Sequence, residues 1–357
     1  MSLTITTTIP LITPVYTPLE FVMTSPGCDY MELDVYVGDS SKGQYDGTKR
    51  TIRIVSTSVT ADIQGIVQPF FRSDASGTVE LKRIDVVGRT VTAGTPSETY
   101  VDCYWVFNGC KRDSWNFTNF MMNASFNGQF LNNWDAPINI HKQDKDSKLY
   151  FFHGLFGNTA SGSYDVSKIY FKTTTNGVPS AGFSTLWNNS PRIYTLPADP
   201  SSLTGLTFNS NTTSYTIDPS RNTTNIGLKT FNITAQDERY TPKRVQWVDS
   251  MGCINGFNFD LLQTNSVEMK KDIFNNNGTF KQYNNKVTDS YTLTSNWITE
   301  KESLALKDLW YSPSVMIDGQ YVIIQNKSMD IKTRREVKLI NYTLEYQKSN
   351  DYKVQIN

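Results

Sequence analysis

The last quarter of the chain constrains the fold most, because strand-like sequence is interrupted there by one helix and then resumes. YTLTSNW has strand character, and SVMIDGQYVIIQN and MDIKTRREVKLINYTLEYQ return to it. Between them, residues 299–311 are predicted to be helical. Thr299 with Glu302 three residues later forms a capping box, in which each side chain satisfies a backbone amide of the first turn. Ser312 followed by Pro313 ends the helix.

The predicted helix has one apolar face. Ala305 and Leu309 are spaced four apart, as are Leu306 and Trp310, so these side chains share a face that can pack on a sheet. A strand, helix, strand and strand in this order favour an assembly module over a catalytic one. Trp310 is both a core candidate and a candidate interface residue.

The composition predicts a mainly β protein. Aromatic residues make up 13% of the 357-residue chain, with 19 Tyr and 19 Phe, and short polar stretches interrupt them throughout. Aromatic and β-branched runs bounded by turn residues are typical of β-strands. The length allows two or three domains with sizeable cores.

The distribution of strand-like runs suggests three β-rich domains. We expect a β-sandwich at 1–115, a middle domain with long polar loops at 116–235, and a C-terminal β-sandwich plus helix at 236–357. In the first domain, VTADIQGIVQPFFRSD predicts a short helix or turn. In the last, KKDIFNNNGTFKQY predicts an extended hairpin arm.

Charge and hydropathy argue against several functions. Lys plus Arg equals Asp plus Glu at 34 each, so we expect neither specific nucleic-acid binding nor attraction to an anionic membrane. No run approaches the roughly 18 apolar residues that a membrane-spanning helix needs. The N-terminal sequence lacks the basic and apolar regions of a signal peptide, so we expect synthesis without secretion by that route.

Four cysteines are present, at positions 28, 103, 110 and 253. Their spacing matches neither a zinc-binding pair nor a dense disulfide framework, which favours buried free thiols. One disulfide between Cys103 and Cys110, across a predicted hairpin, is the alternative.

The acidic residues considered as catalytic candidates have simpler roles. Asp144 and Asp146 lie in a charged turn beside His141, and we interpret them as solvated rather than as a metal or catalytic site. Glu300 and Glu302 lie at the helix start, where acidic side chains favour the helix dipole. No nucleophile motif or phosphate-binding loop is found in the sequence, so we predict neither enzymatic activity nor a cofactor or metal.

Aromatic clusters are the remaining candidates for recognition. The runs 104–107 and 150–152 are predicted to be strand cores, with sugar stacking as the alternative. DSWNFTNFMMN is apolar without clear alternation, which favours an anchor between subunits. The interface candidates in this segment are Trp115, Phe117, Phe120, Met121 and Met122.

Three stretches resemble a family of virion structural proteins from phages and prophages of Bacteroidetes hosts, including crAss-like phages. They are ITPVYTPLEFVMTSPGCDYMELDVYV, RVQWVDSMGCINGFNFD and the block from NWITEKES to NYTLEYQ. The last stretch carries the most recognisable features, Trp297, the Ser312-Pro313 stop and Asn341-Tyr342-Thr343. Cys253 departs from the small residue expected at its position.

The resemblance implies a tail-tip, baseplate or tail-ring component whose C-terminal domain is similar to a tail-tube β-sandwich with one packed helix. Such a protein would form a homo-oligomeric ring, contact other tail or connector proteins, and be located in the virion after assembly in the bacterial cytoplasm. The resemblance brings no catalytic residues. A receptor- or glycan-binding tail adhesin is the alternative, followed by a tail-associated hydrolase.

Overall fold

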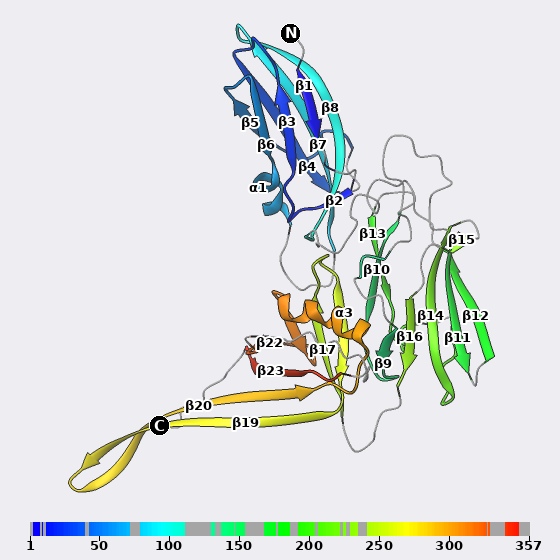
Figure 1. Ribbon diagram of the computed structural model, residues 1–357, viewed down its shortest axis with the longest axis vertical. Coiled ribbons are helices and arrows are strands. Elements are labelled where there is room, and N and C mark those ends of the chain that lie inside the picture. The colour runs from blue at the N-terminus through cyan, green and yellow to red at the C-terminus, as the bar shows by residue number, and fades with distance from the viewer. Residues whose placement is uncertain are drawn as a thin grey trace.

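The structure is a computed structural model, and it confirms a mainly β protein with several sheets (Figure 1). The residues that it describes are 3–7, 9, 12–39, 43–71, 79–110, 130–132, 137–145, 147–153, 168–175, 178–185, 192–203, 206–221, 224–225, 229–234, 241–326, 328 and 340–349.

The N-terminal part is a β-sandwich. One sheet contains β1 (Thr4–Thr7), β3 (Glu20–Thr24) and β6 (Ser58–Asp62). The other contains, in spatial order, β2 (Ile12–Pro14), β8 (Thr95–Phe107), β7 (Leu81–Thr92), β4 (Tyr30–Asp39) and β5 (Thr48–Ile54). The predicted short helix is confirmed as α1 (Gln64–Val67), which continues into a 3-10 turn, Gln68–Phe70.

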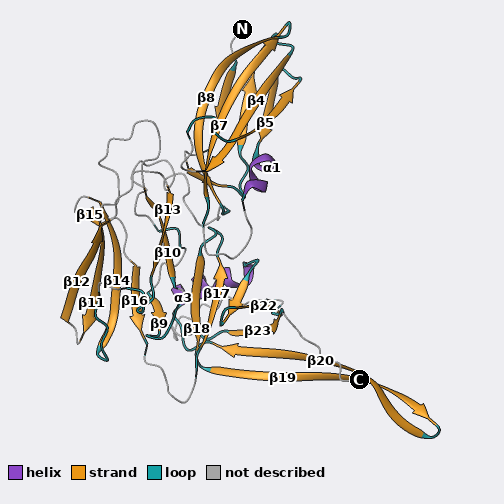
Figure 2. Cartoon of the chain, turned by 180° about the vertical axis from the view of Figure 1, so that it is seen from behind, coloured by secondary structure: helices purple, strands orange, loops and turns teal. Residues whose placement is uncertain are grey.

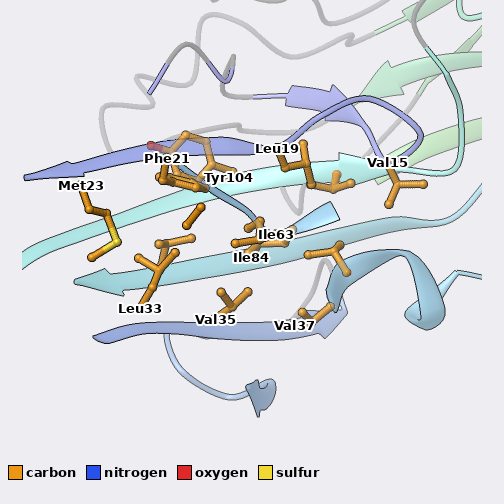
Figure 3. Packing of buried hydrophobic residues seen from close by; sticks show 14 of the residues in the cluster. Val15, Leu19, Phe21, Met23, Leu33, Val35, Val37, Ile63, Ile84 and Tyr104 are labelled. Carbon is orange, nitrogen blue, oxygen red and sulfur yellow. The ribbon is translucent and has the colours of Figure 1, made fainter. Parts of the chain in front are cut away.

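The core of this sandwich forms because alternate residues of its strands point inward. In β3, Phe21 and Met23 are buried while their neighbours along the strand are exposed. Leu33 and Val35 of β4 face them from the other sheet (Figure 3). Phe21 also makes an edge contact with Tyr104, their ring centroids 5.6 Å apart.

The middle part contains a mixed sheet and a separate strand pair. The sheet has the order β12 (Val178–Thr185), β11 (Lys168–Thr175), β14 (Thr212–Arg221), β16 (Lys229–Ile233) and β9 (Ile138–Ile140), with β15 (Thr224–Asn225) beside β14. The pair is β10 (Lys148–His153) with β13 (Arg192–Pro197). Their shared core includes the stacked rings of Tyr215 and Phe231.

The C-terminal part is a seven-stranded sheet covered by one helix. The order is β18 (Ile254–Phe259), β17 (Lys243–Val248), β21 (Val315–Ile317), β22 (Gln320–Ile324), β23 (Thr343–Lys348), β20 (Thr279–Thr294) and β19 (Leu262–Asn276). The helix is α3, Glu300–Tyr311.

The predicted capping box of α3 is confirmed. The Thr299 hydroxyl accepts from the Glu302 amide at 3.3 Å, and the Glu302 carboxylate accepts from the Thr299 amide at 2.7 Å. Leu306 and Leu309 are fully buried against the sheet. Trp310 lies at the margin of this core, half-buried, with its ring 5.9 Å from that of Tyr342.

A further core joins the three parts. Phe107 from β8, Tyr150 from β10 and Met251 from the turn between β17 and β18 belong to one buried cluster. That turn is held by Asp249, whose carboxylate accepts from the amides of Met251 and Cys253. The division at 115 and 235 stays a prediction, but packing across those positions is extensive.

Within the described part of the chain, α1 and α3 are both too short and too polar to cross a lipid bilayer.

Candidate assembly interface

The most distinctive surface feature is a long hairpin arm formed by β19 and β20. The two strands pair from Leu262 with Thr294 at the root to Asn276 with Thr279 at the tip. Asn277 and Gly278 form the connecting turn with φ values of 51° and 80°, the left-handed backbone that two-residue hairpin turns require. The predicted arm is confirmed, and it is longer than the segment that suggested it.

Most of the arm has no support from the sheet. Only residues 291–294 of β20 pair with β23. Beyond them the two strands leave the body together and project to one side (Figures 1 and 2). At about 3.3 Å per residue, the projecting twelve residues from 266 to 277 span roughly 40 Å.

One face of the arm carries exposed apolar side chains, with polar residues such as Lys271 and Asp289 between them, and is called the apolar face below. The odd-numbered residues of β19 share a face with Leu293, which belongs to the core, so this face continues the buried side of the sheet outward. Among the described side chains on it, Val267 is 49% exposed, Met269 56%, Ile273 64% and Phe280 73%.

The opposite face is mostly polar. It carries Thr264, Ser266, Glu268 and Lys270. Lys270 Nζ lies 3.8 Å from Glu268 Oε1. The two faces alternate along each strand, with one irregularity where the pairing shifts by a residue between Asp272 and Ile273, and a register slip of one residue would exchange them.

This arrangement is typical of surfaces that other chains cover. A two-stranded hairpin is at best marginally stable alone in water, and long unpaired strand edges attract further strands. Contiguous exposed apolar surface of this kind marks interaction sites. The arm therefore has the properties of an assembly element.

A small pocket of about 110 Å³ lies at the arm root. Tyr291 and Tyr346 stack there with ring centroids 5.1 Å apart, and the Lys348 ammonium lies 5.2 Å from the Tyr291 ring centroid. Lys243 and Asp318 form an ion pair on its rim. Burial, with smaller contributions from Tyr291 and Asp318, raises the pKa of Tyr346 to about 12.

The sequence-predicted interface residues divide into two groups. Trp115, Phe117, Phe120, Met121 and Met122 all lie outside the described residues. Trp310 is described, and it contacts the helix-covered core rather than the arm. The apolar face of the arm was missed, although the spacing of Val267, Met269 and Ile273 is a visible strand-period signal.

The interpretation of Asp144 as solvated is wrong. Its side chain is 10% exposed, and Oδ2 accepts from the His141 amide, Arg244 Nη1 at 3.0 Å and Asn258 Nδ2 at 2.5 Å. The charged residues around Asp144 favoured a solvent-exposed side chain. Its partner Arg244 could not be seen locally, because it lies a hundred residues later in the sequence, in β17. Asp146 lies outside the described residues.

Glu300 and Glu302 lie in the first turn of α3, as predicted. Glu300 begins α3, and Glu302 completes the cap while also accepting from Asn139 Nδ2 at 2.7 Å. In the part of the chain that can be described, no group of three or more His, Cys, Asp and Glu side chains is arranged to hold a metal ion.

The aromatic runs are core residues where their side chains are described. Tyr104, Trp105 and Phe107 are buried in β8, and Tyr150 and Phe151 are buried in β10. The side chain of Phe152 lies outside the described set.

All four cysteines are free thiols, so the alternative disulfide between Cys103 and Cys110 is not formed. Cys110 is held near the C-terminal part, where its amide donates to the Ser250 carbonyl at 2.6 Å. Burial, followed by the neighbouring Asp249, raises the pKa of the Cys253 thiol well above its ordinary value, which keeps it protonated.

The chain matches no model of a known protein family, and a search of curated proteins finds no match either.

Proposed function

We propose that this protein is a structural component of a phage particle, a tail, baseplate or tail-ring subunit that forms a homo-oligomeric ring and connects neighbouring tail proteins. The arm is the observation that carries the proposal. Its apolar face and open edges are unstable in an isolated subunit and become stable when a neighbour covers them.

The phage assignment is supported by the resemblance of three sequence stretches and by a C-terminal sheet that carries a single packed helix. The neutral charge balance suits contacts made by apolar surface and backbone pairing. The joined core beneath the three parts would hold the arm at a fixed angle to the body.

A direct test compares the full chain with a short-arm variant. Ser266 and Ser290 are paired in the hairpin, so residues 267–289 can be replaced by Asn-Gly, which closes a shorter hairpin of the same register. Light scattering and electron microscopy should show rings for the full chain and a folded monomer for the variant. Rings from both proteins, or a monomer from both, would contradict the arm-based assembly.

A glycan- or receptor-binding tail adhesin is the second candidate, favoured by the pocket with stacked tyrosines and a Lys, Asp and Gln rim. Electron microscopy separates the two, since an adhesin should form a trimer with a protruding tip.

The proposal includes no enzymatic activity. Purified protein is expected to leave host surface polysaccharide and peptidoglycan intact and to contain no stoichiometric metal by elemental analysis. Cleavage that disappears when Asp144 is replaced would instead favour a tail-associated hydrolase.

A further inference from the structure

The arm offers two open strand edges. Among the described strands, β19 is paired along its length with β20 only, and it is the last strand of the sheet. Among the residues that the structure describes, β20 pairs outward with β23 only at 291–294, so residues 279–290 present a second open edge there. Backbone amides and carbonyls along such edges bond either to water or to another strand.

We propose that the arms of neighbouring copies pair edge to edge, with β19 of one copy against β20 of the next. This inference rests on the proposed function and names the contact within it. A second copy fits because each arm carries both required edges at matching length. With all arms pointing the same way, the repeating order β20, β19, β20, β19 remains antiparallel.

Such a contact joins two different surfaces and can therefore repeat around a ring until no arm edge is left open. On the root side of the register shift between Asp272 and Ile273, pairing keeps the pleat in phase, so the face with Val267 and Met269 becomes continuous from copy to copy. The polar face with Thr264 and Ser266 becomes continuous on the other side.

The sheet itself limits the register of this contact. Leu262 lies opposite Thr294 within its own arm, but β23 already occupies the outer edge of β20 at 291–294. Leu262 of one copy can therefore lie no nearer the root than Ser290 of the next, a displacement of at least four residues (294 minus 290).

That displacement is about 13 Å at 3.3 Å per residue, and a regular offset between neighbours tilts the strands relative to the ring axis. At the smallest displacement, Thr264 of one copy lies opposite Thr288 of the next. Both residues are on the polar face of the arm, so replacing them leaves the apolar face intact.

Cysteine cross-linking between copies tests this register. A Thr264→Cys protein is mixed with proteins that carry one cysteine at successive positions along 279–290, and the mixtures are oxidised. Disulfide-linked dimers of the two different variants should recur at every second position from 290 to 284, on the root side of the register shift, and be most abundant with Thr288→Cys. Peptide mass spectrometry separates them from links that involve the four native cysteines.

Thr292→Cys is the matched control. It lies on the same face and strand as Thr288, but its outer edge is covered by β23, where it pairs with Glu345. Its mixed dimer should be at least tenfold less abundant. Equal cross-linking at 288 and 292, a flat profile along 279–290, or dimers of Thr264→Cys with itself would overturn edge-to-edge pairing.

Failure of the edge-to-edge contact can be distinguished from failure of the proposed function. Rings without the mixed disulfide would leave the assembly role in place and show that the arm docks elsewhere, on the body of a neighbour or on another protein. Absence of rings altogether, with the short-arm variant unchanged, would remove the proposed function itself.

Discussion

At the scale of single residues, the fold depends on a few polar side chains that join distant segments. Asp144 from the β9–β10 turn holds Arg244 and Asn258 of the C-terminal sheet. Asn132 accepts from the Tyr150 amide at 2.7 Å and donates to Asn255 at 3.0 Å. The bonds to Arg244, Asn258 and Asn255 cross from the middle part to the C-terminal part, so they tie the β17–β18 end of the C-terminal sheet to it.

Replacing Asp144 with Ala is expected to lower the free energy of unfolding by about 3 kcal/mol, because it leaves the poorly exposed Arg244 guanidinium without its carboxylate. Asp144→Asn, which keeps an acceptor oxygen, should cost less. Chemical denaturation of the full chain measures both values, and an unchanged midpoint for Asp144→Ala would show that the ion pair contributes nothing.

At the scale of elements, α3 covers one face of the C-terminal sheet, whereas the arm extends the same face into solvent. The helix covers one face and buries Leu306 and Leu309 completely. The arm extends that face beyond the helix and leaves it bare. Stability should therefore depend on the helix contact, and association on the arm.

Leu306→Ala is expected to destabilise the protein by about 3 to 4 kcal/mol, as loss of a fully buried leucine does. Trp310→Ala should cost less, about 2 kcal/mol, since the indole is only partly buried at the margin of the core. Thermal and chemical unfolding of the two variants measure which substitution lowers the free energy of unfolding more. A larger loss for Trp310 would mean that its ring contributes more than its burial indicates.

Met269→Lys is expected to weaken self-association about tenfold, about 1.4 kcal/mol, because it places a charge on the apolar face of the arm. Ser266→Lys is the control on the opposite face. Sedimentation across a dilution series compares them, and unfolding midpoints should match the unmodified protein. Equal association constants for the two variants would count against the apolar face as a contact.

At the scale of the whole molecule, three β-rich parts share a core and present one long arm (Figure 1). The chain has no net charge, with 34 basic and 34 acidic residues. Assembly by apolar faces and backbone pairing is consistent with this balance, since neither depends on long-range attraction between unlike surfaces.

The oligomer is therefore expected to persist when NaCl is raised from low to high concentration. Screening shortens the Debye length from about 30 Å at 0.01 M to about 3 Å at 1 M, which weakens ion pairs but not apolar contacts. Light scattering across the salt series measures this. Dissolution of the oligomer at high salt would indicate a charge-based contact instead.

Features that depend on near neighbours in the chain could be predicted from the amino-acid sequence. The cap of α3 needs only Thr299 and Glu302, and the arm turn needs only Asn277 and Gly278 where the backbone is left-handed. Composition, with its aromatic and β-branched runs bounded by turn residues, likewise predicted the β class, and the capping box, the four-residue spacing and Ser312-Pro313 predicted the position of the helix.

Tertiary structure alone decided which distant residues meet. Asp144 looked solvated because its local charges are solvated in most chains, yet Arg244 reaches it from a hundred residues away. The exposure of Val267 and Met269 could not be predicted either. Alternation of apolar residues indicates an apolar face but does not say what packs against it. Only the folded chain shows that α3 packs on the sheet through Leu306 and Leu309 while the arm runs beyond the part of the sheet paired with β23, which leaves that face exposed.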